Sequence, residues 1–407
     1  MQTFNARVIT IAPLQIPFAL KTGVDTDSIH YKNLLSDIAD LDPAIQVSGR
    51  SDTEQYQNLK EDDDDACLFR WQVEDKDGTL RFNVFQNQIA IVDTVLPEHL
   101  ADSVSELENA AKQQTRRLIE RHWPRFVELL QTIRHRVKNP LLLRAGDMET
   151  TTGDPQIHWI SRTLLVAPAE RAQPQVQSLM SGWLAETQYP QHAKEIARGE
   201  RDYSMTWLNY VLVEQQHDYH IDTMILAQYY YTAQENCLKQ LKQAISATYI
   251  DGQLQTAEKQ LSKSRVTTRL HLIDYHEQLK FLTRPKRRLL LEILESWEFG
   301  NLVENSQRMI DVCSSRLEEA DHQRRERSTV MTDLLLVTLS FFAVFELSLY
   351  LVEFSREMMS RPALDYNDES SSLFLGLIAG IDTDIMFGFG FLLTLGLVLI
   401  YKRIKSH

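Results

Sequence analysis

The stretch that decides the architecture runs from Val330 to Val352 and reads VMTDLLLVTLSFFAVFELSLYLV. A second apolar stretch, IMFGFGFLLTLGLVLIY, runs from Ile385 to Tyr401. Each is about as long as a membrane-crossing helix, which needs roughly 17–25 apolar residues. Lipid cannot hydrogen-bond the backbone, so a crossing segment must be helical. We therefore predict two C-terminal transmembrane helices; the alternative is a pair of buried core helices.

Charges around these stretches predict their orientation. Basic residues lie before the first stretch and after the second: Arg316, Arg324, Arg325, Arg327, Lys402, Arg403 and Lys405. The intervening loop is acidic. Because basic flanks stay in the cytoplasm, we expect both termini there and the acidic loop outside. The N-terminal run ITIAPLQIPFAL is broken by Pro13 and Pro17, which does not resemble a signal peptide.

The composition excludes several classes of function. The net charge of -13 argues against nucleic acid as a partner, because phosphate binding needs a basic surface. Three widely spaced cysteines indicate a reducing compartment and no zinc ribbon. No phosphate-binding loop, HExxH or GxSxG motif occurs, so we expect no catalytic residues and no enzyme.

Patterning along the chain predicts the domains. Alternating, β-branched runs predict strands at 4–12, 67–74, 80–87, 89–96, 159–167 and 205–214, with a helical region from Pro97 to about Val137. Helices are expected from His220 to Asp251, over 253–282 and from Pro285 onward. Between Lys286 and Val352 there is no proline, which predicts one continuous helix entering the membrane. The predicted segments are a cytoplasmic α/β domain (1–215), a helical stalk region (216–328), transmembrane helix 1 (329–353), an extracytoplasmic acidic loop (354–384), transmembrane helix 2 (385–401) and a basic cytoplasmic tail (402–407).

The layout resembles the CorA family of divalent-cation transporters. Val330-Met331, the following LLLVT and Phe341 resemble the start of that family's first span, and Ile400 to Lys405 resembles its basic end. The resemblance implies a CorA-like fold, a homo-oligomer (a pentamer) in a bacterial inner membrane, and transport of Mg²⁺ or another divalent cation. The family's Gly-Met-Asn signature is missing, and Val352, Glu353 and Phe354 occupy its positions. This departure puts magnesium selectivity in doubt.

The register of the resemblance suggests which residues of the first span line a pore. They are Ser328, Met331, Leu334, Thr338, Phe342, Phe345 and Leu349. Rings of Phe342 and Phe345 could close a pore by excluding water. The alternative is that these side chains pack against helices or face lipid.

Several acidic and histidine positions are candidate sites. Glu346 and Asp333 are intramembrane acids, and a carboxylate in lipid usually faces a bundle or water; Asp333 could instead be solvated near the interface. Glu304, Asp311 and Glu318 recur every seven residues, so copies could hold a divalent cation between them; the alternative is a solvated face. His217, His220 and Asp222 form an HxxHxD cluster, read as zinc ligands or as surface and capping residues. Glu61–Asp65 is expected to be a solvated loop.

Three functions remain open. The first is an oligomeric divalent-cation channel or transporter gated by a small-molecule or nucleotide ligand on its cytoplasmic domain. The second is a CorA-like membrane effector of an antiviral system, triggered by a nucleotide-type signal. The third is a non-conducting membrane scaffold.

Overall fold

The computed structural model describes residues 4–21, 23–25, 28–47, 66–101, 103–143, 153–206, 208–214, 217–248, 254–360, 373–382, 384–385, 387–392 and 395–396. These residues form two compact units, 1–314 and 315–407. The domain boundary expected at 215 falls inside the first unit. Glu61–Asp65, the second-span residues 397–401 and the basic tail lie outside the described residues.

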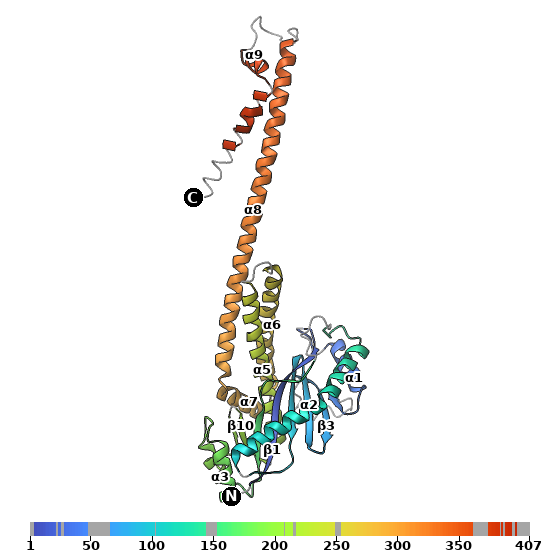
Figure 1. Ribbon diagram of the computed structural model, residues 1–407, viewed down its shortest axis with the longest axis vertical. Helices are drawn as coiled ribbons and strands as arrows, with labels where there is room; N and C mark the ends of the chain where they lie inside the picture. Colours follow the sequence, from blue (N-terminus) through green and yellow to red (C-terminus); the bar gives the residue numbers. More distant parts are fainter. Residues whose placement is uncertain are drawn as a thin grey trace. The chain divides into compact units, whose positions relative to one another are not determined.

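A mixed sheet forms the centre of the first unit (Figure 1). Its main path is β2-β3-β4-β5-β1-β8-β10-β9, and β6 and β7 also pair with β1. All these neighbours are antiparallel except β8 and β10, which are parallel. The strands are β1 (Phe4–Ala19), β2 (Ile45–Val47), β3 (Cys67–Asp75), β4 (Gly78–Phe85), β5 (Asn87–Val95), β6 (His99–Ala101), β7 (Gln156–Ile157), β8 (Ser161–Val166), β9 (Tyr203–Met205) and β10 (Asn209–Val213).

Both faces of the sheet are covered, because its central strands are apolar on both sides. One core contains Leu14 and Ile16 of β1 and is closed by helices that include α2, which lies across the strands in Figure 1. The other core contains Ile9 and Ile11 of β1 and is closed by α5, α7 and the start of α8. The helices of the first face are α1 (Ile29–Ala39), α2 (Val104–Arg136), α3 (Pro174–Trp183) and α4 (His192–Arg198).

Strand β1 is longer than the predicted 4–12. It continues to Ala19 through both prolines. A proline lacks only the N–H, and its carbonyl still accepts: Pro13 O receives the backbone N–H of His158 at 3.0 Å. The region before β3 also contains structure that its polar composition did not predict, namely α1 and β2.

Two other boundaries were predicted wrongly. Helix α2 begins at Val104 rather than Pro97, because β6 intervenes and Ser103 caps the helix by accepting the N–H of Glu106. The single strand expected at 205–214 is two antiparallel strands, β9 and β10. The remaining helices are α5 (His217–Ala247), α6 (Leu254–Phe281), α7 (Arg284–Ser296), α8 (Phe299–Ser360) and α9 (Leu373–Gly380).

The continuous helix expected from Lys286 to Val352 is wrong. Helix α7 ends at Ser296, and α8 begins at Phe299 after a turn at Trp297 and Glu298. Glu298 has φ +54°, the left-handed conformation that interrupts a helix. The buried indole of Trp297 donates Nε1–H to the carbonyl of Thr206 at 3.0 Å, which fixes the turn beside β9.

The apolar end of α8 extends beyond its predicted limit. Helix α8 continues to Ser360, and α9 forms within the region expected to be the acidic loop. In the predicted second span, the described residues 385, 387–392 and 395–396 are helical.

Candidate functional site

One helix in the described part of the chain is long and apolar enough to cross a membrane. It is the part of α8 from Ser328 to Met358, and only 6% of its apolar window is buried. A core helix of a soluble protein would be mostly buried, so this exposure disfavours the alternative of a buried core helix. Its hydroxyl side chains bond within the helix: Thr338 donates to the carbonyl of Leu334 at 2.8 Å and Ser348 to that of Val344 at 2.7 Å.

One face of this segment packs against the second apolar stretch. The Phe345 ring lies 5.0 Å from that of Phe387, and Phe341 lies 6.2 Å from Phe387 and 6.1 Å from Phe391, all edge-to-face. The buried Val352 continues the same face. Within one copy of the chain, Phe345, which was expected to line a pore, contacts the second stretch.

Of the other predicted pore residues, Leu349 borders the small cavity at that contact, and the rest lie off it. Phe342, Met331 and Leu334 are 61%, 65% and 64% exposed, so no described residue covers them. Ser328, Thr338 and Leu349 are also exposed. This leaves an uncovered apolar strip along α8 within one copy of the chain.

Glu346 lies on the far side of α8 from the Phe341–Phe345 contact. At 100° per residue it is about 140° from Phe341 and 100° from Phe345, and it is exposed. Tyr350 and Glu353, four and seven residues later, continue its stripe and are also exposed. Asp333 projects from a different side, again about 140° from Glu346, and is half-buried. The two acids predicted to lie in the membrane are therefore not brought together within one chain.

The stalk acids Glu304, Asp311 and Glu318 are all exposed on α8. Glu304 forms an exposed i,i+4 ion pair with Arg308. In the described residues, no three histidine, cysteine or carboxylate side chains are close enough to hold a metal ion. A cation site at these acids would need side chains from more than one copy.

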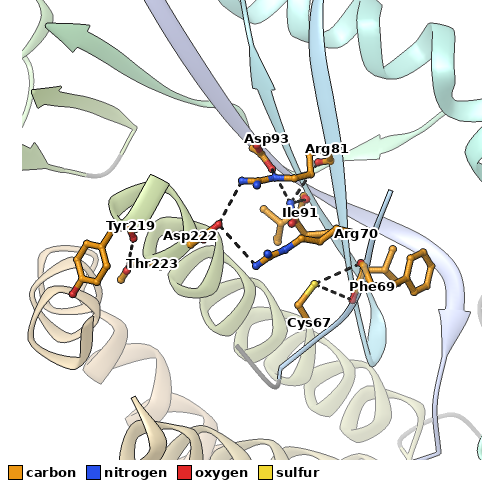
Figure 2. Close-up of polar contacts among 11 residues, drawn as sticks. Cys67, Phe69, Arg70, Arg81, Ile91, Asp93, Tyr219, Asp222 and Thr223 are labelled. Atoms are coloured by element: carbon orange, nitrogen blue, oxygen red, sulfur yellow. Dashed lines mark hydrogen bonds and ion pairs between the residues drawn. The ribbon is translucent and has the colours of Figure 1, made fainter. Parts of the chain in front are cut away.

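Asp222 of the HxxHxD cluster belongs to a charged network that joins the sheet to α5 (Figure 2). Arg81 of β4 donates Nε–H to Asp93 of β5 at 3.0 Å, and its Nη2 lies 3.4 Å from Asp222 Oδ1. Arg70 of β3 pairs with the same Asp222 oxygen at 3.9 Å. Asp222 is therefore an ion-pair partner in the second turn of α5, and the expected capping role is wrong.

Burial dominates the electrostatics of this network. Asp93 is 5% exposed, and burial raises its pKa while Arg81 and Asn83 oppose the rise. Asn83 donates to the same carboxylate oxygen at 2.8 Å. His220 is buried and its ring lies 5.0 Å from that of Tyr203, which gives it a packing role. The side chain of His217 lies outside the described residues.

A second buried network, which sequence reasoning missed, joins the sheet to α2. Arg162 of β8 is 3% exposed and donates Nη2–H to Asn209 of β10, whose amide donates to Glu108 of α2. Burial lowers the pKa of Arg162, and Glu108 opposes that change. The only sequence signal was an arginine within a predicted strand.

Comparisons with protein-family models, with curated proteins and with solved structures find no match to this chain.

Proposed function

We propose that this protein is an oligomeric membrane channel or transporter for a divalent cation, of divergent CorA type, whose cytoplasmic domain controls conduction. The observation that carries the proposal is the extent of α8. Its first turns pack in the first compact unit, where Ile310 and Cys313 are buried and Ser314 accepts a hydrogen bond from Arg265 of α6 at 3.2 Å. The same uninterrupted helix contains the whole segment Ser328–Met358.

This continuity supports mechanical coupling between the two units. A helix transmits rotation or translation along its axis when it contains no break, and α8 contains no proline. A ligand that binds the first unit with different affinity in two states can then shift the state of the apolar segment.

Glu346 supports assembly of several copies. A carboxylate at the centre of a bilayer costs about 2.5–3.5 kcal/mol on insertion scales, so it faces another helix or water. Within one chain the side chain of Glu346 is exposed, on the face away from Phe387. Neighbouring copies or a shared water-filled pore would remove this cost, and a ring of such acids would attract cations.

Ion flux into liposomes tests the proposal. We expect the purified protein to pass Mg²⁺, and Glu346→Gln to lower that flux about tenfold, because losing one ion contact worth about 1.4 kcal/mol changes a rate by that factor. Glu326→Gln makes the same chemical change just before the apolar segment, where Glu326 pairs with His322 at 3.4 Å, and serves as the control. Light scattering of the detergent-solubilised protein measures the number of copies.

The outcomes separate the three functions. Mg²⁺ flux that Glu346→Gln reduces and Glu326→Gln preserves supports the channel. Leakage that begins only when a nucleotide is added supports the signal-triggered membrane effector. No flux of any ion with or without nucleotides supports a scaffold, and a monomer by light scattering contradicts the oligomer.

A further inference from the structure

A basic groove lies beside the C-terminal end of α2, within the first unit. It has a volume of about 1120 Å³. Four of its lining residues are basic: Lys21, Arg134, His135 and Lys138. No acidic residue is among the described residues that line it. This grouping is unusual in a chain whose net charge is -13.

Backbone hydrogen bonds hold the walls of the groove together. The segment after α2 runs beside the end of β1: Lys21 N–H donates to the carbonyl of Leu141 at 2.8 Å, and Leu143 N–H donates to that of Ala19 at 3.1 Å. The side chain of Asn139 donates to the carbonyl of His30 at 2.8 Å, which ties the same segment to α1. Lys21 is therefore held by ordered backbone beside the segment that follows α2, and it lines the same groove as Arg134.

Lys21, Arg134 and Lys138 have no ion-pair partner in the described part of the chain. Other arginines of the first unit do: Arg81 pairs with Asp93, and Arg121 pairs with Asp75 and Asp77. A helix C-terminus favours basic side chains, which accounts for Arg134 and His135 in the last turn of α2. It does not account for Lys21 or Lys138, which lie outside the helix. The helix dipole alone therefore does not explain the cluster.

We infer that this groove binds a soluble, phosphate-bearing small molecule. Several cations around one cavity fit a ligand with several negative charges, and arginine matches the geometry of a phosphate while lysine supplies point charge. The volume exceeds what a single phosphate ion fills and suits a ligand the size of a nucleotide. Nucleic acid is disfavoured by the overall acidity of the chain. The inference names a ligand class for the first unit and does not require conduction.

Direct binding to the full-length protein in detergent tests it. The probes are inorganic tripolyphosphate and ATP without metal, measured by titration calorimetry at moderate salt. We expect saturable binding that Arg134→Gln combined with Lys138→Gln weakens at least tenfold, since each lost charge-assisted contact costs about 1.5 kcal/mol or more. The control is Lys259→Gln combined with Lys263→Gln, which removes two exposed cations from α6 in the same unit. It should change the dissociation constant less than about twofold.

Circular dichroism of both double variants verifies that they fold, so that a loss of binding reports the groove. Absence of saturable binding to wild type overturns the inference, as does equal weakening by the two double variants. Association that requires vesicles of anionic lipid, with none for tripolyphosphate or ATP, overturns the assignment to a soluble ligand. Because binding is measured without flux, a failed flux assay leaves this result unaffected.

Discussion

The buried histidine of α6 gives a prediction whose size can be worked out. His271 is 6% exposed, and its ring centroid lies 5.9 Å from that of Tyr230 and 6.1 Å from that of Tyr229 on α5. Its Nε2 has no hydrogen-bond partner in the described structure, so protonation would bury a charge and a donor without an acceptor. Burial therefore lowers the pKa of His271 from 6.5 to about 4, although a hydrogen bond with the backbone of Tyr230 opposes the change.

Proton linkage gives the direction in which pH changes the free energy of unfolding. Between pH 6.5 and 4 the unfolded state binds more protons at His271 than the folded state does, so acid favours unfolding. The stability that depends on a neutral His271 is complete above pH 6.5 and is lost as the pH falls toward 4. Between pH 7 and pH 5 this single group should remove about 2 kcal/mol from the free energy of unfolding.

Urea unfolding in detergent, followed by tryptophan fluorescence, measures this loss. All six tryptophans precede residue 315, so the signal reports the first unit alone. We expect His271→Asn to show about 2 kcal/mol less acid destabilisation than wild type. His276→Asn, at an exposed position of the same helix, should retain the wild-type dependence. Equal losses in wild type and His271→Asn would refute the reasoning.

Other perturbations test the networks around α5 and α8 by the same unfolding assay. Asp93→Ala should lower the free energy of unfolding by about 3 kcal/mol, because it leaves buried donors unpaired. Asp222 is about a quarter exposed, so Asp222→Ala should lower it by about 1 kcal/mol. Equal losses for the two variants would contradict the burial argument. Trp297→Phe keeps the ring and removes the donor to Thr206, so it should cost about 1 kcal/mol, against about 3–5 kcal/mol for Trp297→Ala. Cys67, Cys237 and Cys313 are buried, and burial raises the pKa of the Cys237 and Cys313 thiols to about 11. Maleimide should therefore label none of the three cysteines before denaturation and all of them after it. Rapid labelling of the native protein would contradict their burial.

Local patterns in the sequence predicted a large part of the first unit. The hairpin of β3 and β4 follows from alternating residues around Asp77-Gly78, and Gly78 has φ +142° with Val95 O only 2.6 Å from where a Cβ would lie. The break before α8 was not predicted, because it depends on the bond from Trp297 to Thr206, some ninety residues earlier. Gly300 lies just after the break, but the left-handed residue is Glu298.

Prediction of the candidate sites depended equally on tertiary partners. Arg81 and Asp93 are directly opposite in the register of β4 and β5, a pairing that spacing alone does not reveal. To assign Phe345 to a pore, one must know which face of α8 contacts Phe387. The periodicity of apolar residues identifies a face of the helix but does not identify the segment that packs against it. Lys21 lies more than a hundred residues from Arg134 in the sequence, so only the path of the chain brings them to one groove.

The charged side chains of this molecule fall into two groups. Some are neutralised by ion pairs within the fold, and others are available to a ligand or to another copy of the chain. Arg81 pairs with Asp93 of the neighbouring strand at 3.0 Å, and Arg121 of α2 pairs with Asp75 of β3 at 2.9 Å, so both charges stabilise the fold. Lys138 in the groove lacks such a partner among the described residues, and Glu346 is exposed within an apolar helix. Lys138 lies beside other basic side chains, and Glu346 would lose its hydration in lipid, so an opposite charge lowers the energy of either group. The groove should therefore attract anions. The stripe of α8 that includes Glu346 should attract cations or a neighbouring helix. Ligand binding and assembly depend on different residues, so they can be measured separately on the same protein.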